Sequence, residues 1–149
     1  MTSKAAEARR AWRALSRLFL SDETHDRFHD ACEAVGLPHP GSLKALLSID
    51  VDAAAPMRTL AEHLRCDASY VTALVDALED SGYVARRASD TDRRVKLVEL
   101  TGEGRKAKER ALDVLLAPPP SLEQLTATEL RTLAQLLERV GGAYPPLPS

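Results

Sequence analysis

The chain has 149 residues, 44% of them hydrophobic and 28% charged, with 20 Lys and Arg against 22 Asp and Glu. These values are typical of one globular domain and exclude a disordered or membrane-embedded chain. No apolar run approaches the roughly 20 residues that span a bilayer. The net charge of −2 argues against a histone-like coat on nucleic acid, but it leaves room for a local basic patch.

The two cysteines, Cys32 and Cys66, lie far apart, without a CxxC motif or a preceding secretory signal. A chain of this size buries roughly 70% of the surface that its unfolded form exposes, so its core needs no disulfide or structural metal. We therefore expect reduced thiols in a cytoplasmic protein without a cofactor. Either thiol could sense peroxide if it were exposed with a lowered pKa, although burial is the commoner fate of a free cysteine.

Helical signals dominate the first third of the chain. Residues 5–35 lack Gly and Pro and carry Trp12 and Phe19 on one side, which predicts one long first helix that ends at Gly36. Residues 42–49 predict a second, short helix, and a linker follows it.

Two short helices joined by a turn come next, with apolar residues at spacings of three and four. The second of them is about fourteen residues long; either Asp67 or Ser69 can cap it, and Gly82 closes it. Residues 83–87 and 95–100 then alternate as β-strands, so we expect a β-hairpin with a charged tip between them.

The chain returns to helix at Thr101 and is stopped by the three prolines at 118–120. A capping box at residues 126–129 opens the last helix. Its apolar residues have heptad spacing and expose more apolar surface than one small domain easily covers, which predicts dimerisation. These seam residues are Leu130, Leu133, Leu137 and Val140.

Helix, turn, helix and hairpin together form the layout of a winged helix-turn-helix, whose second helix enters the DNA major groove. We therefore predict a mainly α fold with a small β-wing, as one domain over residues 1–149. Within it, residues 42–100 are the DNA-binding region, and residues 5–35 and 101–140 are dimerisation helices.

The wing carries a local excess of positive charge. Between residues 86 and 96, five cations outnumber two acids, Asp90 and Asp92, and give a local charge of +3. The cations are Arg86, Arg87, Arg93, Arg94 and Lys96. Long arginines at a hairpin tip suit a narrow minor groove, and Asp92 could orient the Arg94 guanidinium. The alternative is a solvated surface loop, which most charge runs are.

Small and polar side chains at the start of the second helix are predicted to face outward: Ser69, Tyr70, Thr72 and Ala73. Hydroxyls can bind bases or phosphates, and a helix N-terminus attracts phosphate. Two other interpretations stay open. Tyr70 could pack on a neighbouring helix, and Ser69 could serve only as a cap.

The same residues resemble the multiple antibiotic resistance regulator family, abbreviated MarR. The resemblance is carried by residues 60–64, 67–79, 82–84 and 90–101. Its most specific part is an Asp-x-Arg motif followed by an alternating strand that ends in Leu-Thr, here Asp92, Arg94, Leu100 and Thr101. The order of the flanking helices extends the resemblance over residues 15–140.

The resemblance implies a homodimeric transcriptional regulator, usually a repressor, on a pseudo-palindromic double-stranded operator. Motif by motif, it implies a minor-groove arginine at Arg94 with Asp92 as its partner, major-groove contacts from Ser69, Tyr70 and Thr72, and backbone contacts from Arg93 and Lys96. Such regulators often release DNA when a small aromatic or phenolic compound binds or a cysteine is oxidised. The sequence identifies no residues of an effector pocket.

The chain also departs from the family pattern. Ala73 and Ala77 stand where the family often has Arg, so DNA affinity should depend more on the wing. Residues 38–42 lack the glutamine-containing helix start common in the family, which leaves the neighbouring pocket undefined.

Parts of the sequence fit other functions as well. Asp22, His25, His29 and Cys32 share one helical face and could bind zinc, but such a face is also typical of a solvated stripe or a polar patch in a dimer. We expect no enzyme, because the chain lacks a Gly-rich phosphate loop, HExxH and GxSxG. The main alternative is a winged helix that binds another protein instead of specific DNA.

Overall fold

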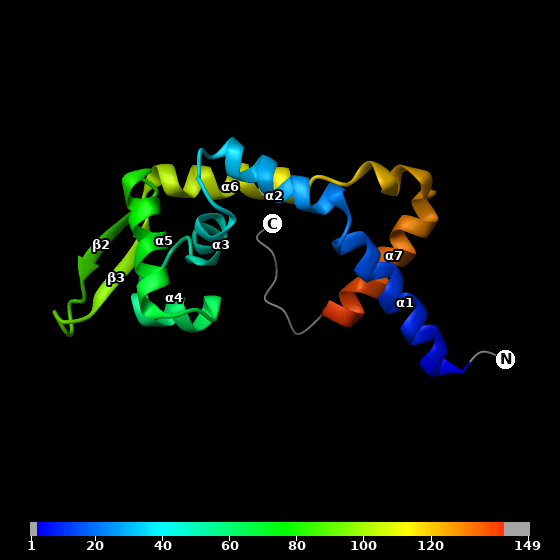
Figure 1. Ribbon diagram of the computed structural model, residues 1–149, viewed down its shortest axis with the longest axis horizontal. Coiled ribbons are helices and arrows are strands. Elements are labelled where there is room, and N and C mark those ends of the chain that lie inside the picture. The colour runs from blue at the N-terminus through cyan, green and yellow to red at the C-terminus, as the bar shows by residue number, and fades with distance from the viewer. Residues whose placement is uncertain (1–2, 142–149) are drawn as a thin grey trace. The chain divides into compact units, whose positions relative to one another are not determined.

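The computed structural model describes residues 3–141, and the chain forms two compact units, with the boundary after Leu116. Within the described residues, the first unit contains six helices and a small sheet (Figure 1). Its elements are α1 (Lys4–Phe19), α2 (Asp22–Ala34), α3 (Pro40–Ser48), β1 (Ala55–Pro56), α4 (Met57–Leu64), α5 (Ala68–Asp80), β2 (Val84–Ala88), β3 (Lys96–Leu100) and α6 (Gly102–Leu116). The predicted fold class, mainly α with a small β-wing, is confirmed.

The predicted long first helix is wrong in one respect, because it is broken into α1 and α2 at Leu20 and Ser21. The hydroxyls of Ser21 and Thr24 both donate to the Leu18 carbonyl oxygen, at 2.7 and 2.8 Å. In a continuous helix this oxygen would accept from the N–H of residue 22; here its backbone donor is the Ser21 N–H, at 3.3 Å. The end of α2 is as predicted, with Gly36 in the left-handed region at φ 65°.

The sheet is antiparallel and three-stranded, in the order β1-β3-β2. The hairpin of β2 and β3 was predicted, and its register pairs Val84 with Leu100 and Ala88 with Lys96. The short strand β1 was not predicted, because its two residues fall in the expected linker. It pairs Ala55 with Val98 and attaches the start of α4 to the wing.

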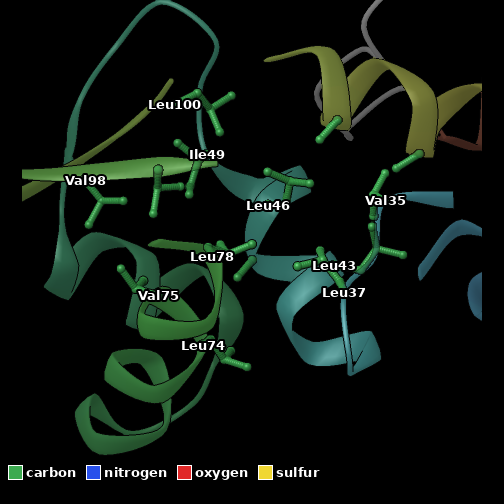
Figure 2. Close-up of a cluster of buried hydrophobic side chains, with 14 of the residues drawn as sticks. Val35, Leu37, Leu43, Leu46, Ile49, Leu74, Val75, Leu78, Val98 and Leu100 are labelled. Carbon is green, nitrogen blue, oxygen red and sulfur yellow. The ribbon is translucent and has the colours of Figure 1, made fainter. Parts of the chain in front are cut away.

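The core lies where α3, α5 and the sheet meet (Figure 2). Leu43 and Leu46 of α3, Val75 and Leu78 of α5, and Val98 of β3 are each at most 1% exposed. Complete burial of such side chains contributes about 1.5–3 kcal/mol each, so this cluster fixes α5 against the base of the wing.

Helix α6 is fastened to the same core by a buried lysine. Lys108 is 9% exposed, and its Nζ donates to the Ile49 carbonyl oxygen at 2.7 Å, just after the end of α3. Burial lowers the pKa of Lys108, and the nearby charge of Asp50 acts in the opposite direction. Arg105, one helical turn earlier, lies 3.6 Å from the Asp52 carboxylate and holds the same loop.

The second unit contains a 3₁₀ helix (η1, Pro120–Gln124) and the helix α7 (Ala127–Gly141). The predicted capping box is present: the Thr126 N–H donates to Glu129 Oε2 at 2.8 Å, and the Glu129 N–H donates to Thr126 Oγ1 at 3.4 Å. The Thr126 hydroxyl also donates to Glu129 Oε2, at 2.7 Å, and the two bonds from Thr126 to this carboxylate hold the pKa of Glu129 below its usual range. None of the helices within residues 3–141 has the length and apolar character to cross a membrane.

Candidate nucleic-acid interface

Helix α5 begins with an aspartate cap. Asp67 Oδ1 accepts from the Tyr70 N–H at 2.8 Å and from the Ser69 hydroxyl at 2.7 Å. These two hydrogen bonds, with the Ser69 hydroxyl first, lower the pKa of Asp67. Of the two predicted caps, Asp67 is therefore the one that binds the helix N-terminus, and Ser69 is left on the exposed face beside it.

The predicted outward face of α5 is exposed as expected at Ser69, Tyr70, Thr72 and Ala73. Tyr70 nevertheless also packs on a neighbouring helix. It is 50% exposed, but a Cβ atom at Gly41 in the first turn of α3 would lie 2.6 Å from its hydroxyl oxygen. The end of the Tyr70 ring therefore rests on a position that only glycine fits without displacing it.

The structure divides the cations of the wing into two groups. Arg86 forms ion pairs with Asp76 and Glu79 of α5, and Arg87 forms ion pairs with Asp90 and Glu99. By contrast, Arg93, Arg94 and Lys96 are exposed, and within residues 3–141 their side chains have no ion pair. The unneutralised charge of the wing therefore lies in the second group.

Asp92 acts on the backbone of the wing tip. Its Oδ1 accepts from the Arg94 N–H at 3.0 Å, and the Val95 N–H donates to the Asp92 carbonyl oxygen at 2.9 Å. From the sequence, Asp92 was expected to orient the Arg94 guanidinium; the structure instead pairs it with the main chain. A two-residue bond of this kind is an Asx turn, which fixes the loop from which the Arg94 side chain extends.

Three predicted DNA-contact residues line one hollow of about 430 Å³ between the wing and the two short helices. Thr72 comes from the first turns of α5, and Arg94 and Lys96 come from the wing. The rest of the lining is Met57, Arg58, Ala61, Ala68, Val71 and Arg86. Of the four cations that border the hollow, Arg58 and Arg86 form ion pairs, whereas Arg94 and Lys96 form none within residues 3–141. These two unpaired cations suit a phosphate or another anion.

The roles of Arg86, Asp76 and Glu79 were not predicted from the sequence. Arg86 was counted as one more wing cation, although its side chain is only 24% exposed and is bound to α5. No local pattern reveals this pairing, because the partners lie ten and seven residues away on another element.

The zinc candidates are not gathered into a site. Within residues 3–141, no three His, Cys, Asp or Glu side chains are placed so that they could hold a metal ion. Asp22 and His25 are exposed, and His29 lies 3.6 Å from the Glu33 carboxylate. Cys32 belongs to the buried core cluster.

The two redox candidates differ in their surroundings. Cys32 is 5% exposed, and burial raises the pKa of its thiol, which disfavours the thiolate that reacts with peroxide. Cys66, in the turn between α4 and α5, is half-buried. Its N–H donates to the Ala61 carbonyl oxygen at 3.1 Å.

A sequence model of the MarR family matches residues 40–96, which contain α3, α4, α5 and the hairpin as far as Lys96. Among curated protein sequences, none matches the chain significantly.

Solved structures resemble the chain over most of its length. The YusO protein from Bacillus subtilis is 26% identical, with a TM-score of 0.72 over 96% of this chain and 100% of that one. CouR from Rhodococcus jostii, bound to p-coumaroyl-CoA, is 27% identical, with a TM-score of 0.59 over 91% and 93%. A mutant of MepR from S. aureus, bound to an oligodeoxyribonucleotide, is 20% identical, with a TM-score of 0.64 over 89% and 98%, a likeness of fold alone.

Proposed function

We propose, from the match of residues 40–96 to the MarR family, that the protein is a transcriptional regulator of this family that binds double-stranded DNA as a homodimeric repressor. The operator is pseudo-palindromic, with half-sites about one helical turn, or roughly 34 Å, apart. We expect it to act in the cytoplasm and to catalyse no reaction.

The observation that carries the proposal is the group of unpaired cations beside the exposed start of α5. Arg93, Arg94 and Lys96 have no carboxylate partner within residues 3–141, and two of them line the same hollow as Thr72. In this assignment α5 lies in the major groove with Ser69 and Thr72 at the base edges. Arg94 enters the minor groove, and Asp92 holds the loop that presents it.

Exposed apolar side chains support the proposed dimer. Trp12 and Phe19 of α1 are 68% and 67% exposed, and Leu136 and Val140 of α7 are 51% and 81% exposed. Large apolar side chains exposed on a helix are typical of a protein interface. A second copy that covers them would also set the separation of the two recognition helices.

Release of DNA is assigned to a small-molecule or redox signal. The structure of CouR with p-coumaroyl-CoA, an aromatic acyl ligand, supports the first of these. In this chain, a ligand that favours a different separation of the two α5 helices would shift the population away from the DNA-binding state. Of the two thiols, half-buried Cys66 is the better redox candidate, because it lies directly before the recognition helix.

The test is a fluorescence polarisation titration of the protein against DNA from upstream of its own coding region, at two salt concentrations, with scrambled DNA as competitor. We expect saturable binding of two protomers per site that resists the competitor and weakens steeply with salt. Binding that is independent of salt or of sequence would contradict the proposal and favour a winged helix that binds another protein.

A further inference from the structure

The recognition helix of this protein carries acids where a polyanion is expected to bind. The sequence of α5, Ala68–Asp80, contains no Lys or Arg, and its charged side chains are Asp76, Glu79 and Asp80. Residues 69, 72, 76 and 79 follow one another at helical spacing, so two of these carboxylates continue the exposed row that Ser69 and Thr72 begin. Unpaired carboxylates in that row would repel DNA phosphates.

Arg86 binds both of these carboxylates. Its Nη1 lies 2.7 Å from Glu79 Oε2, its Nη2 pairs with Asp76 Oδ1, and the same Nη2 donates to the Thr72 carbonyl oxygen at 3.4 Å. One guanidinium on β2 thus contacts residues 72, 76 and 79, which lie on successive turns along the wing-facing side of α5. The planar fork of arginine suits this geometry, because it donates to two acceptors at once.

We propose that Arg86 is a positioning residue that neutralises Asp76 and Glu79, so that α5 can approach DNA, and that fixes the root of the wing to the recognition helix. The inference rests on the proposed DNA-binding function. It explains how a helix without cations, in which Ala73 and Ala77 occupy positions where the family often has Arg, enters a groove lined by phosphates. The cations that contact DNA are then the unpaired ones, Arg93, Arg94 and Lys96.

Arg86 also lines the hollow that contains Arg94 and Lys96. A rival assignment therefore follows from the same geometry: Arg86 contacts a phosphate directly. The two assignments differ in what happens when the carboxylates are removed. If Arg86 acts by neutralisation, it is dispensable once Asp76 and Glu79 are uncharged; if it binds a phosphate, it is not.

The experiment compares DNA affinity and its salt dependence among wild type, Arg86→Gln, the double variant Asp76→Asn with Glu79→Gln, and the triple variant that combines all three changes. Thermal unfolding of each variant verifies that it is folded. We expect Arg86→Gln to weaken binding about tenfold, which corresponds to about 1.4 kcal/mol. The triple variant should recover most of that loss, and the double variant should bind at least as tightly as wild type.

Several results would overturn the inference. Equal affinity of Arg86→Gln and wild type would show that the carboxylates need no neutralisation. A triple variant as weak as Arg86→Gln, with a salt slope smaller by about 0.9, would identify a phosphate contact. Loss of affinity in the double variant would show that the carboxylates themselves contact DNA. This comparison does not depend on Arg86→Gln, so it can be made even if that variant does not fold. If wild type binds no DNA, the proposed function fails as well, whereas the first three results leave it intact.

Discussion

Gly104 allows α6 to pack against the base of the wing, and its replacement by alanine should be strongly destabilising. A Cβ atom at residue 104 would lie 1.8 Å from the carbonyl oxygen of Tyr83 and 2.8 Å from its carbonyl carbon. These are backbone atoms, so no side-chain rotation relieves the clash. The same oxygen accepts from the Thr101 N–H at 3.0 Å, and that bond would be strained when α6 moves away. Overpacking of about 1–3 kcal/mol and loss of a hydrogen bond of about 0.5–1.5 kcal/mol together predict a loss of about 1.5–4.5 kcal/mol.

The matched control for Gly104→Ala lies two residues earlier on the same helix. A Cβ atom at Gly102 would meet nothing within 4 Å, and alanine has the higher helix propensity, so Gly102→Ala should leave stability unchanged or raise it slightly. Urea denaturation of the two variants beside wild type measures both free energies of unfolding. If the Gly104 variant is as stable as the Gly102 variant, the close packing of α6 on Tyr83 is refuted.

Two further predictions concern groups with shifted pKa values. Because burial lowers the pKa of Lys108 in the folded state, the unfolded chain binds more protons in the interval below the ordinary lysine pKa, and folding should become more favourable as the pH rises through it. Chemical denaturation across this alkaline range should show that rise in wild type relative to Lys108→Met; parallel curves would contradict it. The lowered pKa of Asp67 acts with the same sign in the acid range: its stabilisation of α5 is present above the ordinary aspartate pKa and is lost as the pH falls through the lower folded value. Asp67→Asn should retain the cap without this acid dependence, and Asp67→Ala should lower the thermal midpoint at neutral pH. Thermal unfolding followed by circular dichroism at several pH values measures both effects. Identical pH dependence of the thermal midpoint in wild type and Asp67→Asn at acid pH would contradict the prediction.

Much of the fold was predictable because it follows local rules. Helical periodicity, glycine at helix ends and strand alternation located α3 to α6 and the hairpin, and the capping box located the start of α7. The errors occurred where a weak local signal had to compete with a longer pattern. The break at Ser21 looked like continuous helix because no Gly or Pro marks it, and β1 is only two residues long, so it exists through its pairing with β3.

The candidate site was predictable in its position but not in its electrostatics. The sequence count that gave the wing a local charge of +3 weighted all five cations equally. In the structure, Arg86 and Arg87 form ion pairs, whereas the other three cations have no ion-pair partner within residues 3–141. A count within the wing misses carboxylates that approach from other elements, as Asp76 and Glu79 do from α5. For Tyr70 the sequence left packing on a neighbouring helix open, but it did not identify Gly41 of α3 as the contact, because the two residues are far apart in the sequence.

The most direct test of the central claim compares Arg94→Ala with Arg110→Ala in DNA binding. Each change removes one exposed arginine, so the two variants have the same net charge. Arg110 lies on α6, outside the proposed DNA interface. The account predicts that Arg94→Ala weakens operator binding by about 1–3 kcal/mol, or roughly 5- to 150-fold, with an unchanged thermal midpoint, whereas Arg110→Ala binds like wild type. Equal affinities of the two variants would contradict the assignment of the wing to DNA.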